Sequence, residues 1–186
     1  MSLLNKTFMS LVLIVGVVFT QDHFVLEIDG TGESQPFIIQ SSVLEAAGFE
    51  ASDEVGAFDS AGLLTGGACD SEFGELLVGS EVWDGVNTLA FSAIGSIDNC
   101  GVGGTQLPGY VEGNEVILKV WDASEGVEVD VEYVAAATVF GSPLIIVTNM
   151  TIVQEGDILG CTDDSACNYN ADATLDDGSC AIEDCA

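Results

Sequence analysis

Apolar and polar residues alternate in short runs along most of the chain, from residue 23 to residue 153. The clearest run, 127–133, has an apolar side chain at every second position and acidic side chains between them. The run 115–121 likewise puts Val116, Leu118 and Val120 on one face. A period of two is typical of β-strands with one buried face. We therefore expect strands at 23–28, 36–40, 53–59, 74–83, 88–94, 115–121, 127–133 and 143–153, and a helical turn or a connection at 42–49.

These runs, roughly eight or nine strands in all, predict an all-β protein. No stretch keeps the 3.6-residue period of an amphipathic helix, and the 22 glycines suit many tight turns. Short strands separated by Gly, Asp and Asn favour an antiparallel β-sandwich, jelly-roll or Ig-like, with a barrel as the alternative. The apolar run 144–147 predicts burial on both faces of the last strand. We expect the sandwich at residues 21–154, a linker at 155–159 and a small irregular appendage at 160–186.

The first twenty residues have the pattern of a secretory signal peptide. Lys6 supplies a positive start, residues 11–19 are apolar, and Val18 and Thr20 are small enough for cleavage before Gln21. The apolar stretch is short for a membrane span, and a retained N-terminal anchor is the alternative. The pattern predicts a secreted or cell-surface protein. The even number of cysteines, six, agrees with an oxidising compartment.

The chain is strongly acidic. It holds 31 Asp and Glu against 2 Lys and Arg, a formal charge of −29, which becomes −30 if Lys6 is removed with the signal. Such a protein cannot hold nucleic acid by neutralising phosphates, and anionic lipid surfaces would repel it. Screening of its self-repulsion by salt fits a marine or saline setting.

The cysteines fall into two groups. Cys69 and Cys100 lie in the two least regular loops, and we expect them to form a disulfide worth about 3–4 kcal/mol on the loop-entropy model. Pairing of either with a C-terminal cysteine is the alternative. Three pairings are possible among the other four, and the sequence does not choose between them: Cys161, Cys167, Cys180 and Cys185.

The C-terminal segment concentrates oxygen-bearing side chains between its cysteines. Residues 160–180 contain no Lys or Arg, so their carboxylates would repel one another unless a cation lay among them. From residue 168 to residue 176 the oxygen-bearing side chains occupy alternate positions, as in a tight loop that turns successive oxygens towards one Ca²⁺. We therefore predict a calcium site with the candidate ligands Asp163, Asp164, Asn168, Asn170, Asp172, Thr174, Asp176 and Asp177.

Other interpretations of this segment fit less well. An EF-hand loop needs Gly and Glu where this chain has Ala173 and Ser179. A zinc site is disfavoured because no CxxC pair is present and the one histidine, His23, is far away in sequence. The remaining alternative is a disulfide-tied acidic tail that binds ions diffusely.

Residues 160–180, GCTDDSACNYNADATLDDGSC, resemble a short acidic, Cys-bounded repeat of secreted and surface proteins of marine bacteria. That repeat follows roughly the pattern GCTD..ACNY...A..DDGSC. The segment is also similar, more loosely, to the Asp-rich calcium repeats of thrombospondin. The resemblance covers 21 of the 186 residues. It implies a calcium-stabilised extracellular module with no catalytic role.

Three motifs of the predicted sandwich carry a second resemblance: DEVGAFD at 53–59, GELLVGSEVWDG at 74–85 and GYVEGNEVILKVWDA at 109–123. They are similar to modules of large secreted proteins of marine Bacteroidetes-like bacteria, where such modules often stand near the acidic repeat. The resemblance spans residues 24–123. It implies a sandwich displayed at a surface and assigns it no further activity.

Catalysis is not expected. Nucleophilic catalysis needs a base beside the nucleophile, and the only histidine is next to the predicted mature N-terminus, where a surface role suits it. The cysteines are explained as disulfides, no phosphate-binding GK[ST] motif occurs, and no carboxylate pair for glycoside hydrolysis can be singled out among 31 acids. Asp53, Glu54 and Asp59 offer a second place for calcium but are better explained as turn residues.

Two non-catalytic functions remain, and a glycosidase or calcium-dependent lyase is disfavoured. The first is a calcium-stabilised structural or adhesive protein that assembles with other surface proteins or with copies of itself. Residues 143–153 would then be a strand given to a neighbour or, more simply, an ordinary closing strand. The second is a carbohydrate-binding module that stacks polysaccharide on aromatic rings. It requires an exposed face made by Trp83, Trp121, Tyr110 and Tyr133, whereas core packing is the simpler expectation for both tryptophans.

Overall fold

The computed structural model describes residues 23–67, 69–153 and 157–181. The predicted signal peptide, residues 154–156 at the junction of the predicted sandwich and linker, and Cys185 lie outside them. The all-β prediction is confirmed, with one short α-helix in the described part. The elements are β1 (Ser34–Ile39), α1 (Ser41–Ala47), β2 (Glu54–Leu63), β3 (Phe73–Val82), β4 (Leu89–Ile94), β5 (Ile97–Asp98), a 3₁₀ turn (Cys100–Val102), β6 (Gln106–Leu107), β7 (Val116–Asp122), β8 (Val127–Ala135), β9 (Ile145–Ile152), β10 (Leu159–Gly160) and β11 (Leu175–Asp176).

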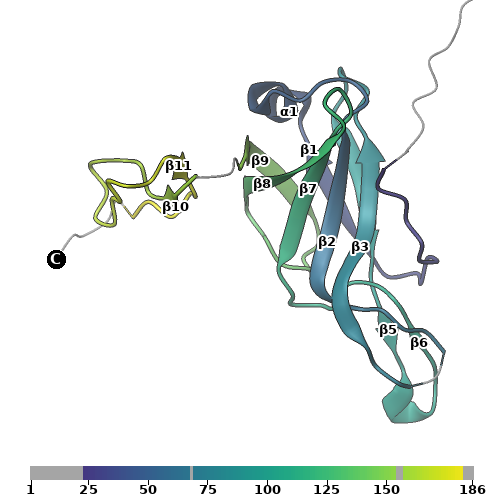
Figure 1. Ribbon diagram of the computed structural model, residues 1–186. Coiled ribbons are helices and arrows are strands. Elements are labelled where there is room, and N and C mark those ends of the chain that lie inside the picture. The colour runs from purple at the N-terminus through teal and green to yellow at the C-terminus, as the bar shows by residue number, and fades with distance from the viewer. Residues whose placement is uncertain (1–22, 68, 154–156, 182–186) are drawn as a thin grey trace, which may run out of the picture.

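Seven strands form one sheet in the order β3-β2-β7-β8-β9-β1-β4 (Figure 1). Strand β8 joins its two halves, because the start of β8 pairs with β7 and its later part, from Val131, pairs with β9. Neighbouring strands are antiparallel except β1 and β9, which are parallel. The sheet is therefore mixed rather than purely antiparallel as predicted.

The two end strands of this sheet, β3 and β4, come together. A Cβ placed on Gly79 of β3 would lie 2.8 Å from Cα of Ala93 in β4. The sheet thus folds over, and side chains from both halves share one core, including Val55, Leu118 and Ile145. This arrangement agrees with the predicted sandwich.

The predicted alternation in β7 is confirmed. Val116, Leu118 and Val120 are 2%, 1% and 0% exposed, while the side chains between them are partly exposed. The helical turn predicted at 42–49 is α1, which buries Val43 and Leu44 and ends at Gly48 in the left-handed region (φ 90°).

Two strand predictions are wrong in detail. Residues 23–28 form no strand, because the N–H groups of His23 and Phe24 donate to the carboxylate of Glu54 instead of to a neighbouring strand. The run 144–147 is not buried on both faces. Ile146 is 39% exposed while Ile145 is buried, since the outer face of β9 is open to solvent there.

The predicted disulfide Cys69–Cys100 is present, with the two Cα atoms 5.8 Å apart. It ties the β2–β3 loop to the 3₁₀ turn at the end of the molecule that carries β5 and β6 (Figure 1). None of the helices in the described part of the chain has the length and apolar character needed to cross a membrane.

Gly79→Ala tests the closure of β3 on β4. The added methyl would meet backbone atoms of Ala93 and Ser92 within 3 Å, so we expect a loss of about 2 kcal/mol in the free energy of unfolding in urea. Gly30→Ala is the control, because no atom lies within 4 Å of its Cβ position, and it should change stability by less than about 0.5 kcal/mol. Equal stabilities for the two variants would contradict the closure.

Candidate functional site

The C-terminal residues 157–181 form a small unit closed by a disulfide, here called the acidic module. Strand β10 pairs in parallel with β11, and Cys161 is bonded to Cys180 with the Cα atoms 4.8 Å apart. Cys167 is also disulfide-bonded. Leu159, which the sequence places in the linker, lies in β10, so the ordered module begins before residue 160.

Two predicted calcium ligands close turns of their own. Oδ1 of Asp163 accepts hydrogen bonds from the hydroxyl and the backbone N–H of Ser165, at 2.6 and 2.8 Å. Oδ1 of Asp177 accepts one from the N–H of Ser179 at 2.9 Å. The hydroxyl and then the N–H of Ser165, and likewise those of Ser179, hold the pKa of the two carboxylates below the usual value, so both are ionised at neutral pH.

The two predicted asparagine ligands also stabilise the module. Asn168 donates to the carbonyl of Ser179 at 2.7 Å and accepts from the N–H of Ala181 at 2.8 Å, which joins two parts of the module. Oδ1 of Asn170 accepts from the N–H of Asp172 at 3.1 Å.

The remaining predicted ligands lie at the surface of the module. Thr174 donates to Asp157 at 2.9 Å, and Asp176 accepts from the N–H of Gly178 at 3.2 Å. Asp164, Asp172 and Asp176 are exposed. Within residues 23–67, 69–153 and 157–181, no group of three or more His, Cys, Asp or Glu side chains is placed to hold a metal ion. A calcium site that also uses amide, hydroxyl and carbonyl oxygens stays a prediction.

The acidic module touches the sandwich at β8 and β9. A Cβ on Gly178 would lie 3.4 Å from Val134, and a narrow groove there is lined by residues of both parts, among them Glu132 and Asp177. Burial, and next the charges of Asp177 and Glu115, raise the pKa of Glu132. Like charges therefore face each other across this contact.

Asp59, at the centre of β2, is fully buried. Its carboxylate accepts from the N–H of Ala61 at 2.9 Å, from the N–H of Val111 at 2.8 Å and from the side-chain amide of Asn114 at 2.9 and 3.0 Å. Buried carboxylates are tolerated when their oxygens are hydrogen-bonded in this way. Asp59 thereby holds the loop that follows β6.

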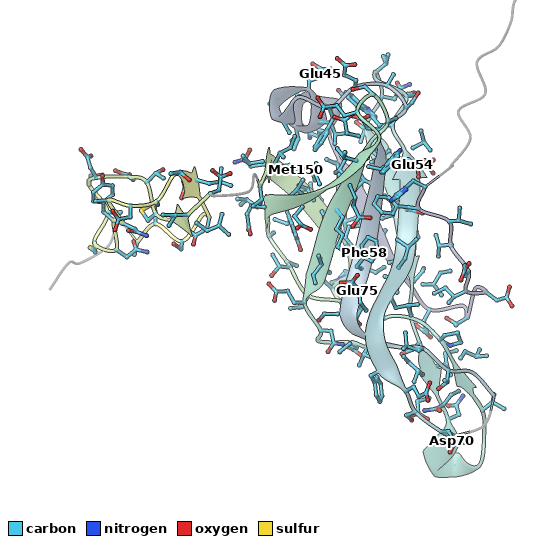
Figure 2. The ribbon with its side chains drawn as sticks, viewed as in Figure 1. Glu45, Glu54, Phe58, Asp70, Glu75 and Met150 are labelled. Atoms are coloured by element: carbon cyan, nitrogen blue, oxygen red, sulfur yellow. A yellow bond between two sulfur atoms is a disulfide. The ribbon has the colours of Figure 1, made fainter. Side chains whose placement is uncertain are left out.

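Asp53 and Glu54 act in the same way at the start of β2, where they are 4% and 2% exposed. Asp53 accepts from the N–H groups of Glu50 and Ala123, and Glu54 accepts from those of His23 and Phe24 (Figure 2). The interpretation of these acids as turn residues is wrong for Glu54 and Asp59, which lie within β2. It is right for Asp53, whose N–H donates to the carbonyl of Glu50 at 3.2 Å and closes the turn before the strand. The three acids anchor irregular backbone, since β2 lies between two strands and is covered on both faces along 54–59.

The four aromatic residues considered for sugar stacking do not form one exposed face. Trp83 is 2% exposed, as core packing predicts, and Tyr110 is 8% exposed. Trp121 is only partly buried, and His23 covers its ring in a stack of 3.8 Å between centroids. Tyr133 is partly buried and donates its hydroxyl to the carbonyl of Val116 at 2.8 Å.

His23 and Lys119 lie on the same outer surface, around Glu128. Nζ of Lys119 is 3.2 Å from Glu75 and 3.3 Å from Glu128, and Nε2 of His23 is 3.2 Å from the other oxygen of Glu128. The contacts join β3, β7 and β8 to the N-terminal segment. The contact with Glu128 accounts for the position of His23 at the surface, so no catalytic role is needed to explain it.

A pocket of about 600 Å³ that the sequence did not single out lies beside Tyr110. Its walls come from four separate parts of the chain, near residues 33–34, 95–97, 110–112 and 141–143. No single stretch carries a motif for it. The one local signal is glycine at positions 95 and 141, where neighbouring side chains occupy the space of a Cβ.

Comparison with known proteins gives no assignment. No protein family matches the chain, no curated protein matches its sequence, and no solved structure matches its fold.

Asp59→Asn tests the role of the buried carboxylate. An amide cannot accept all the hydrogen bonds from Val111, Ala61 and Asn114, and its NH₂ group would face other donors, so we expect a loss of about 2–4 kcal/mol in unfolding free energy. Asp70→Asn, at the exposed β5–β6 end, should lose less than about 0.5 kcal/mol (Figure 2). A loss for Asp59→Asn as small as this control would overturn the assignment.

Glu132→Gln tests the cost of ionising Glu132 at the module contact, which comes first from burial and then from the charge of Asp177. Because the folded-state pKa of Glu132 lies above its ordinary value of 4.5, its ionisation opposes folding, and the opposition grows as pH rises through that value. We expect the variant to match the parent at pH 4 and to exceed it at pH 7, by under about 1 kcal/mol since the groove is open to salt and water. Equal unfolding free energies of the variant and the parent at both pH values would show that the ionisation of Glu132 does not oppose folding.

Proposed function

We propose that this is a secreted structural or adhesive protein, without catalytic activity, whose acidic module is stabilised by Ca²⁺. The two disulfides support an oxidising environment for the folded chain. The predicted signal peptide supports export from the cell. The resemblance of residues 160–180 to acidic repeats of marine bacterial surface proteins supports the same location.

The contact between the acidic module and the sandwich is the observation that carries the proposal. Asp177 and Glu132 face each other there, and the module contains no Lys or Arg that could offset the charge. A divalent cation bound to the module would reduce this repulsion and favour its packing against β8 and β9. Calcium would in this way rigidify the link between the two parts of the protein.

The exposed side of this region suits contact with other molecules. Val134 in β8, Leu144 just before β9 and Ile146 in β9 are 43%, 38% and 39% exposed, although they are large and apolar. Other surface proteins or copies of this chain are the partners we propose. The charge of −29 disfavours nucleic acid and anionic membranes as partners.

Calcium titration of residues 21–186, monitored by calorimetry, tests the proposal. We expect saturable binding with a dissociation constant of roughly 0.1–1 mM, the range of extracellular modules. The triple change of Asp172, Asp176 and Asp177 to Asn should abolish the heat. The control carries the same loss of charge at exposed sandwich positions, Asp29→Asn, Glu45→Gln and Asp70→Asn, and should bind as the parent does.

Two results would contradict it. If the triple variant keeps the binding heat of the parent, calcium does not bind in the acidic module. If the binding heat falls equally in the triple variant and the control, calcium binding depends on the net charge of the protein alone. In either case the proposed calcium-dependent packing would have no basis.

A further inference from the structure

The pocket beside Tyr110 has walls that are fixed by backbone hydrogen bonds. Ser96 donates to the carbonyl of Tyr110 and Gly95 to that of Glu33, both at 2.9 Å. Gly113 donates to the carbonyl of Phe140 at the same distance. Asp59 holds the N–H of Val111, next to the pocket residue Glu112. The pocket is therefore formed before any ligand arrives, and its volume of about 600 Å³ lies in the range of small-molecule sites.

Tyr110 directs a polar group into this pocket. Its ring is stacked on Phe140 with centroids 4.5 Å apart, and the residue is only 8% exposed. Its hydroxyl lies over Gly95, where a Cβ would be 3.1 Å from the oxygen. No group in the described part of the chain forms a hydrogen bond with this hydroxyl. A tyrosine that is nine-tenths buried and lines the pocket with a hydroxyl that has no hydrogen-bond partner in the described chain is a place for a ligand.

The pocket is negatively charged and contains no basic side chain. Its ten lining residues include Glu33 and Glu112, which are exposed at the rim, and none is Lys, Arg or His. Glu112 extends over Gly141, whose left-handed backbone (φ 91°) leaves the space that a side chain would fill. Burial, and then the charges of Glu33 and Glu112, raise the pKa of Tyr110. The same field favours a positively charged ligand.

We propose that this pocket binds a primary ammonium group, with the hydroxyl oxygen of Tyr110 and the carboxylates of Glu33 and Glu112 as its three acceptors. An ammonium group carries three N–H donors and no acceptor, which matches this set. A divalent metal ion fits less well, because the only two carboxylates that line the pocket are exposed at its rim and the other side-chain oxygens, those of three serines and Tyr110, are neutral hydroxyls. A neutral sugar would leave both charges uncompensated, and Phe140 already covers one face of the Tyr110 ring.

The ammonium group can come from two sources, a lysine side chain of a partner protein or a free amine. The mature chain has a single lysine, and Lys119 is held by Glu75 and Glu128, so a second copy of this chain does not supply the group from that residue. The inference goes beyond the proposed function and does not depend on calcium.

Amide NMR of residues 21–186 in 0.15 M salt tests the proposal, with n-butylammonium as the probe. We expect saturable shifts at Gly95, Ser96 and Gly141. Neither n-butanol, which lacks the charge, nor tetramethylammonium, which lacks N–H donors, should produce them. Acetyl-Gly-Lys-Gly-amide and spermidine distinguish the sources. Tighter binding of the peptide than of spermidine indicates a partner's lysine, and tighter binding of spermidine than of the peptide indicates a free amine.

Two variants and two controls separate the pocket from the net charge. Tyr110→Phe keeps the ring and removes the hydroxyl, and Glu112→Gln removes one charge at the surface. Tyr110→Phe should weaken n-butylammonium binding roughly tenfold, the effect of losing one hydrogen bond to a charged group. Glu112→Gln should weaken it by about two- to fivefold, because it removes one of the two charges at an exposed position. Tyr169→Phe and Glu45→Gln alter exposed residues elsewhere and should bind as the parent does (Figure 2).

The proposal is overturned by any of four outcomes. The first is that n-butylammonium causes no saturable shifts at the pocket, and the second is that n-butanol binds as tightly as n-butylammonium. The third is that Glu45→Gln weakens n-butylammonium binding as much as Glu112→Gln does. The fourth is that CaCl₂ causes the same shifts, with an affinity that Tyr110→Phe leaves unchanged. Because Glu112 is exposed, its variant keeps the test valid even if Tyr110→Phe lowers stability.

Discussion

The carboxylates at Asp53, Glu54 and Asp59 accept hydrogen bonds from backbone that no strand ladder satisfies. Their donors include Phe24 in the N-terminal segment, Val111 in the loop after β6 and Ala123 in the β7–β8 turn. Burying three charges this way is stable only while each oxygen keeps its donors. Strand β2 therefore fixes the path of three irregular segments that lie far apart in the sequence.

The rest of the molecule depends on this anchoring. The loop held by Asp59 carries Tyr110 and Glu112, and with them the two most distinctive walls of the pocket. The segment held by Glu54 brings His23 onto Trp121 and towards Glu128, which in turn holds Lys119. A chain with so few positive charges thus uses backbone N–H groups where other proteins would use Lys or Arg to satisfy buried acids.

The sequence was sufficient for the features that follow a local pattern. Alternation in residues 115–121 located β7 and its buried face, and the loop positions of Cys69 and Cys100 predicted their disulfide. It failed where partners are distant. Nothing local shows that residues 23–28 donate to Glu54, or that β1 and β9 pair in parallel across the chain. The pocket was missed for the same reason. The regular spacing of residues 168–176 predicts calcium ligands, and in the structure Asn168 and Thr174 hold the turns of the acidic module by hydrogen bonds to Ser179 and Asp157. The calcium site stays a prediction.

Hydrogen exchange of individual backbone amides, measured by NMR on the oxidised protein, tests the anchoring by β2 most directly. The account predicts that the amides of Phe24, Val111 and Ala123 exchange as slowly as those of Val55 and Ala57 within β2, because each donates to a buried carboxylate. Exchange of these three amides at the rate of the exposed loop amides at Asp29 and Gly30 would contradict it. The irregular segments would then be held by side-chain packing, and the carboxylates would not be the constraint on which the fold depends.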